Sequence, residues 1–87
     1  MNTCEKIKYE VGTILKVIPS SYIKGVKTTT AEYVIVISNT KNWTPQVVRY
    51  DIKTGGMGNI SYYKNMHWSS KEKCWRVYNC NTIIPTL

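Results

Sequence analysis

The sequence has no phenylalanine, one alanine, two leucines and one histidine, and each shortage excludes something. Leucine and alanine are strong helix formers, so their scarcity argues against a helical protein. A metal-free hydrolase or nuclease needs an acid and a base held together, and nothing in the spacing pairs His67 with a carboxylate. We therefore expect a protein that is not an enzyme.

Long apolar runs are also missing. The longest covers residues 33–37, whereas a helix that crosses a bilayer needs about 20 apolar residues. The first ten residues carry Glu5, Lys6, Lys8 and Glu10 and lack the apolar core of a signal peptide. We therefore expect a cytoplasmic protein without a membrane partner.

Cysteine is scarce and odd in number, with Cys4, Cys74 and Cys80. An odd count without a signal peptide favours free thiols. Cys74 and Cys80 would lie about 20 Å apart in an extended strand, which is beyond disulfide reach. No C-x-x-C pair of the kind used by structural zinc sites is present. We therefore expect no metal and no cofactor.

The sequence is rich in β-branched residues, tyrosine and positive charge. It has 10 Ile, 8 Val, 10 Thr and 7 Tyr, residues that pack well on a pleated sheet. Its 87 residues suffice for one small domain. The 12 Lys and Arg against 5 Asp and Glu give a net charge of +7, which predicts an anionic partner.

Five stretches show the alternation of half-buried strands or lie between turn signals: residues 7–18, 28–38, 46–54, 60–68 and 73–79. Residues 33–37 are apolar on both faces and predict a central strand that is covered on both sides. The glycine-rich residues 55–59 are the strongest turn signal. The spacing predicts one all-β domain over residues 1–87, a five-stranded antiparallel meander closed into an SH3-like barrel. Residues 81–87 would form a tail that caps one open end. An OB-type barrel and an open sheet with a minor helix are the alternatives.

The alternation assigns inner and outer faces to the last three predicted strands. The inward residues are Val48, Tyr50, Ile52, Ile60, Tyr62, Met66, Trp68, Trp75 and Val77. The outer face would present Arg49, Lys53, Tyr63, His67, Arg76 and Tyr78. Rings interleaved with cations are typical of surfaces that bind single-stranded nucleic acid, because bases stack on rings while cations follow phosphates.

The sequence therefore predicts a small basic module that binds RNA or single-stranded DNA through these six residues. One alternative is an inhibitor or adaptor that neutralises an acidic host protein, such as a defence factor or a toxin. Another is a small barrel-type nuclease that uses His67. Ile, Asn, Lys and Tyr make up 34 residues, a bias towards AT-rich codons that fits a phage accessory protein as well as a bacterial one. A phage protein would act in the host cytoplasm. The outward aromatic residues are also compatible with a self-association face, so a homodimer is a further alternative.

Overall fold

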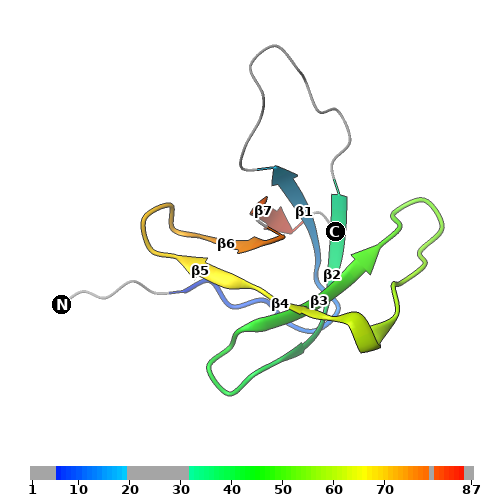
Figure 1. Cartoon of the computed structure of the whole chain (residues 1–87), viewed down its shortest axis with the longest axis horizontal. Coiled ribbons are helices and arrows are strands. Elements are labelled where there is room, and N and C mark those ends of the chain that lie inside the picture. The colour runs from blue at the N-terminus through cyan, green and yellow to red at the C-terminus, as the bar shows by residue number, and fades with distance from the viewer. Residues whose placement is uncertain (1–5, 20–31, 79, 86–87) are drawn as a thin grey trace, which may run out of the picture.

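The computed structural model describes residues 6–19, 32–78 and 80–85, with the backbone alone for residues 18, 19 and 80–85 (Figure 1). This part of the chain is all β, with one short 3-10 turn and no α-helix. The elements are β1 (Ile14–Pro19), β2 (Glu32–Asn39), β3 (Pro45–Tyr50), η1 (Ile60–Tyr62), β4 (Lys64–Asn65), β5 (His67–Ser69), β6 (Cys74–Val77) and β7 (Cys80–Pro85). The predicted all-β antiparallel fold is confirmed.

The strands form one sheet in the order β4-β3-β2-β1-β7-β6-β5, and every pair is antiparallel. Its two end strands, β4 and β5, are separated in the chain by Met66 alone. The Met66 N–H donates a hydrogen bond to the Pro45 carbonyl at the start of β3 (3.0 Å). One stretch of chain therefore pairs with β3 through its first part and with β6 through its second part.

The core consists mainly of valines from the strands of this sheet. Its buried members are Tyr9, Leu15, Val17, Val34, Val36, Val47, Met66, Trp75 and Val77. Burial of each such aliphatic side chain contributes about 1.5–3 kcal/mol. The predicted inward positions of Met66, Trp75 and Val77 are confirmed, and so is that of Val48.

The prediction that β2 is covered on both faces is wrong. Val34 and Val36 are fully buried, but their neighbours Tyr33, Ile35 and Ile37 are only half-buried. The strand therefore alternates between the core and a partly open face, as antiparallel sheets commonly do. Residues 28–31 of the predicted strand lie outside the described part of the chain.

The first strand was predicted from residue 7, but β1 begins at Ile14. Gly12 has a positive φ of 97° and turns the chain, which only glycine adopts without strain. The preceding residues are nevertheless held in place: the Trp75 indole N–H donates to the Ile7 carbonyl (2.7 Å), and the Asn39 amide donates to the Tyr9 carbonyl (2.9 Å). Tyr9 itself is only 5% exposed.

The third and fourth predicted strands are shorter than expected. Strand β3 ends at Tyr50, and the chain then makes an excursion over residues 51–63 before β4 begins. This β3–β4 excursion projects from the sheet in Figure 1. Ile52, Ile60 and Tyr62 were predicted to point inward, but all three are exposed, Ile60 by 61% and Tyr62 by 74%.

The predicted fifth strand corresponds to β6, and the predicted tail contains most of β7. Strand β7 pairs with β1 on one side and β6 on the other. The capping role of residues 81–87 stays a prediction.

Candidate nucleic-acid interface

Two open cavities adjoin on the surface beside β3. The large cavity has a volume of about 900 Å³ and is lined by Lys16, Glu32, Tyr33, Arg49, Tyr50, Asp51, Ile52, Lys53, Thr54, Gly56, Met57 and Gly58. The small cavity has a volume of about 310 Å³ and is lined by Val48, Arg49, Gly58, Asn59, Tyr62, Lys64 and Tyr78. Arg49 and Gly58 belong to both linings, so the two cavities meet at these residues.

Cations and tyrosines dominate the charged and aromatic lining of the two cavities. The cations are Lys16, Arg49, Lys53 and Lys64, and the tyrosines are Tyr33, Tyr50, Tyr62 and Tyr78. Two carboxylates, those of Glu32 and Asp51, line the large cavity. Proteins that bind single-stranded nucleic acids commonly combine aromatic rings and cations on one surface.

Arg49 lies where the cavities meet. Its guanidinium Nη1 is 3.3 Å from the Glu32 Oε2, and its guanidinium carbon lies 5.3 Å from the centre of the Tyr78 ring. The Arg49 side chain is 66% exposed in spite of these contacts. The carboxylate and the ring therefore orient the guanidinium while leaving much of it open to solvent.

Tyr78 adopts a left-handed backbone conformation directly after β6, with a φ of 55°. Such a conformation costs a bulky residue about 1–3 kcal/mol, and residues of this kind concentrate at ligand sites. The strained turn places the Tyr78 ring beside Arg49, which comes from β3.

The β3–β4 excursion folds back against the end of β3. The Asp51 carboxylate accepts hydrogen bonds from the backbone N–H groups of Lys53 (2.9 Å) and Thr54 (3.4 Å), and these bonds lower the pKa of Asp51. Gly55, with a φ of 78°, donates to the Asp51 carbonyl (2.7 Å). The Gly58 N–H then donates to the Arg49 carbonyl (2.8 Å), which brings the excursion beside Arg49.

The short turn η1 presents Tyr62 to the small cavity. Asn59 caps this turn, because its Oδ1 accepts the N–H of Ser61 (2.8 Å) and its carbonyl accepts the N–H of Tyr62 (2.9 Å). The cap explains why the predicted strand fails here: Asn side chains favour local backbone turns over strand pairing.

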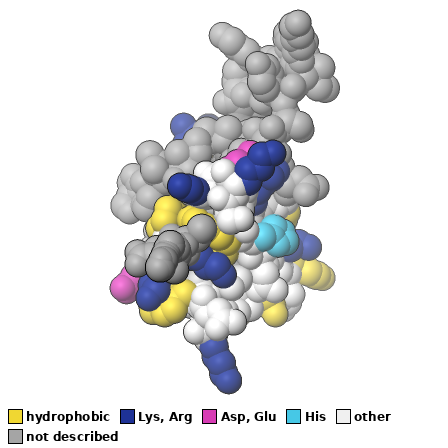
Figure 2. Space-filling model, turned by 90° about the vertical axis from the view of Figure 1, so that its left-hand side faces the viewer, with side chains coloured by type: hydrophobic (Ala, Val, Ile, Leu, Met, Phe, Trp, Pro, Cys, Tyr) yellow, Lys and Arg dark blue, Asp and Glu magenta, His cyan; other side chains and the backbone are white. Residues whose placement is uncertain are grey.

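The structure brings three of the six predicted site residues together, Arg49, Lys53 and Tyr78. The other three, Tyr63, His67 and Arg76, line neither cavity. His67 and Arg76 are register partners on β5 and β6. Figure 2 shows the single histidine at the surface beside basic side chains.

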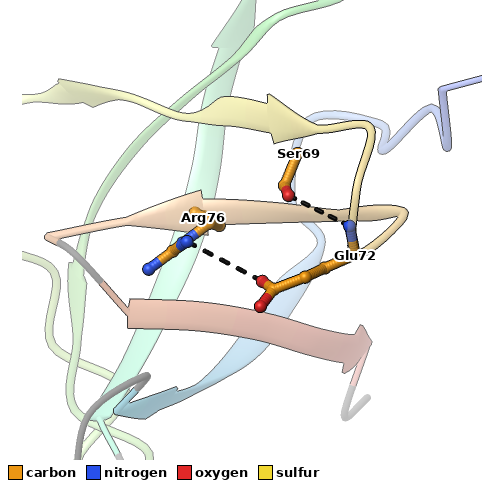
Figure 3. Close-up of polar contacts among 3 residues, drawn as sticks. All are labelled: Ser69, Glu72 and Arg76. Atoms are coloured by element: carbon orange, nitrogen blue, oxygen red, sulfur yellow. Dashed lines mark hydrogen bonds and ion pairs between the residues drawn. The ribbon is translucent and has the colours of Figure 1, made fainter.

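The Arg76 side chain already has an acidic partner. Its Nη1 lies 3.7 Å from the Glu72 Oε1, and the Glu72 N–H donates to the Ser69 Oγ (3.2 Å) in the turn between β5 and β6 (Figure 3). His67 and Arg76 form a second basic region on β5 and β6, and neither residue lines a cavity beside β3.

Among the cations and tyrosines that line the cavities, five were absent from the predicted site: Lys16, Tyr33, Tyr50, Tyr62 and Lys64. Tyr50 and Tyr62 were assigned to the core because the predicted strands over residues 46–54 and 60–68 gave both of them inward positions. Asp51 and Asn59 carried the signal that the strand stops, since both residue types favour turns and caps.

Cys74 lies on β6 and pairs with Ser69, two register steps from the pairing of His67 with Arg76. Burial raises the pKa of the Cys74 thiol, with a further rise from Glu72 and an opposing effect from Arg76. The thiolate, which is the nucleophilic form, is thus disfavoured at neutral pH.

Within the described ranges, no three His, Cys, Asp or Glu side chains come together in a way that could hold a metal ion. The same part of the chain holds no helix of the length and apolarity needed to span a membrane. Comparison of the chain with protein-family models, curated proteins and solved structures gave no match.

Proposed function

We propose that the protein is a small non-enzymatic module that binds single-stranded nucleic acid, RNA or DNA, along the two cavities beside β3. The observation that carries this proposal is the meeting of both cavities at Arg49, with four cations and four tyrosines in their combined lining. Phosphates would follow the cations and bases would stack on the rings.

A single strand fits this surface better than a duplex. Base faces are accessible for stacking in single strands, and each base stacked on an aromatic ring contributes about 1–3 kcal/mol. The described residues contain no α-helix that could enter a major groove. The net charge of +7 adds a general attraction to phosphates.

We also infer that the sheet closes into an SH3-like barrel. Support comes from Met66, which alone separates the end strands β4 and β5. The contact of Arg49 with Tyr78 gives further support, because three strands of the sheet order lie between β3 and β6. Closure would bring these two strands to the same side and create the small cavity between them.

The test is fluorescence anisotropy with labelled RNA and DNA oligonucleotides of about eight nucleotides, titrated between about 50 and 200 mM salt. We expect affinity to fall steeply with salt, because cations that contact phosphates release counterions. R49Q should weaken binding and reduce the slope of log K against log salt by about 0.7, the value for one lost contact to a single strand.

R76Q is the matched control, since it removes the same charge from the separate basic region on β6. It should leave the salt slope unchanged. An absence of binding, or an affinity that does not depend on salt, would contradict the proposed function. Equal effects of R49Q and R76Q on affinity and salt slope would show that the binding surface is not located at the cavities.

Exposed apolar side chains on the β3–β4 excursion favour a second candidate, an inhibitor or adaptor that binds a protein. Met57 and Ile60 are both at least half exposed there. A pull-down from nuclease-treated lysate distinguishes the candidates. A partner that stays bound after nuclease treatment and is lost from the I60S variant would support protein binding.

A further inference from the structure

The small cavity differs in chemistry from the large one. Among the described residues that line it, two are cations, two are tyrosines and none carries a carboxylate. Its volume of about 310 Å³ lies at the lower end of the range of small-molecule sites, about 300–1,000 Å³. A cavity of this size and charge suits one compact anionic ligand with an aromatic part.

Two flat surfaces border the small cavity. Tyr62 is 74% exposed, so its ring is accessible to a ligand. The Arg49 guanidinium is held against the Tyr78 ring at 5.3 Å and by Glu32 at 3.3 Å. Tyrosine rings and guanidinium planes are both surfaces on which unpaired bases stack.

Two polar groups complete the lining. Lys64 is exposed at the start of β4, two residues after Tyr62, and supplies an ammonium group for a phosphate. The Asn59 Oδ1 already accepts the Ser61 N–H, so the amide nitrogen is the end that can donate to a ligand. A base edge offers acceptors to such a donor.

Resting on the proposed function, we propose that the small cavity binds one nucleotide unit. The base stacks on Tyr62 and on the Arg49 guanidinium, and the phosphate contacts Lys64. The same chemistry describes a nucleotide within a strand and a free mononucleotide. Arg49 also lines the large cavity, so a strand could continue from one cavity into the other.

The test compares Y62A with Y63A, because these adjacent tyrosines are both exposed and only Tyr62 lines the small cavity. Binding is measured with an oligonucleotide of about eight nucleotides and with a free mononucleotide. Y62A should weaken oligonucleotide binding by roughly 5- to 150-fold, the effect of one lost stacked base. Y63A should retain the affinity, and Y62F should restore it because the ring is kept.

A second pair of variants tests the phosphate contact. K64Q should weaken binding and lower the salt slope by about 0.7 for a single strand, and K41Q, on the exposed loop before β3, should not. In amide spectra, the mononucleotide should shift the signals of Gly58, Asn59 and Tyr62. Unchanged melting temperatures of the variants show that each one folds.

The outcomes separate this inference from the proposed function. If the oligonucleotide binds but Y62A and Y63A behave alike, the nucleotide site in the small cavity is refuted and nucleic-acid binding stands. Another outcome is that the mononucleotide binds as tightly as the oligonucleotide and Y62A abolishes the binding of both ligands. That result would support the nucleotide site in the small cavity and refute a strand as the natural ligand. If neither ligand binds, both proposals fall.

Discussion

Glu32 forms an ion pair with Arg49, at the position where a phosphate would bind under the proposed function. Its carboxylate is 3.3 Å from the guanidinium, and both side chains are well exposed to solvent. Exposed pairs of this kind are worth about 0.2–1 kcal/mol, so a phosphate can displace the carboxylate at small cost. The Glu32 carboxylate would also repel a phosphate that approaches the large cavity.

The E32Q variant should therefore bind an oligonucleotide more tightly, by about 1.5- to 5-fold, with a free energy of unfolding within about 1 kcal/mol of the parent chain. Anisotropy titrations and urea denaturation measure the two quantities. E72Q is the control, because it removes the same charge from the carboxylate beside Arg76. An equal gain in E72Q would show that net charge, and not the Arg49 contact, controls the affinity.

At the same scale, the sequence identified some site residues and missed others for a physical reason. Arg49 and its neighbour Val48 follow a true strand alternation, so their outward and inward positions were predictable. Tyr62 was missed because a capped turn interrupts the alternation. The contact of Arg49 with Tyr78 joins distant parts of the chain, and no local pattern reports it.

Among the elements, the N-terminal segment of residues 6–10 shows how tertiary contacts replace strand pairing. Its alternation predicted a strand, but Gly12 turns the chain before β1 begins. The segment is held instead by the buried Tyr9 side chain and by hydrogen bonds to its carbonyls from Trp75 and Asn39. The alternation itself does not hold here, because Ile7 and Val11, which share its phase with Tyr9, are 45% and 62% exposed.

Burial raises the pKa of Tyr9 above its ordinary value of 10.0, and the nearby Cys74 raises it further. At pH values well below the ordinary pKa of 10.0, the Tyr9 hydroxyl is neutral in both the folded and the unfolded chain. As the pH rises above it, the unfolded chain ionises first, so this contribution to folding stability is progressively lost.

Urea denaturation at about pH 8 and about pH 10.5 should show a smaller loss of unfolding free energy in Y9F than in the parent chain. A single group can change stability by at most about 1.4 kcal/mol per pH unit. Since Y9F keeps every other ionisable group, the difference between the two chains isolates Tyr9. An identical loss in both would show that Tyr9 ionises equally in the folded and unfolded chains.

For the whole molecule, the all-β class and the antiparallel direction of the strands were predictable, but their number was not: the described chain has seven strands where five were predicted. Strand alternation and turn residues located β2, β3 and β6. The division of one predicted strand into β4 and β5, which pair with different partners, depends on contacts made only after folding. Met66 keeps the same inward orientation in either case, so its burial was predictable although the division was not.

The proposed closure of the sheet predicts slow hydrogen exchange at the Met66 amide, which donates to Pro45 at 3.0 Å. In a closed barrel this amide should be protected about as strongly as the amides of the interior strand β2, because it exchanges only on global opening. Exchange as fast as in the exposed turn after Tyr50 would indicate that the two ends of the sheet separate readily. Exchange monitored by amide spectra in deuterated buffer gives the comparison directly.

Residues 51–65 bury no side chain, yet they supply one wall of each cavity. Substitutions in this stretch therefore change the lining of the cavities without removing anything from the valine-rich interior. Under the proposed function, substitutions of the exposed side chains in this stretch other than the turn-forming Asp51, Gly55 and Asn59 would alter ligand preference with little change in thermodynamic stability. The same separation makes this stretch the natural place to graft foreign recognition sequences onto the domain.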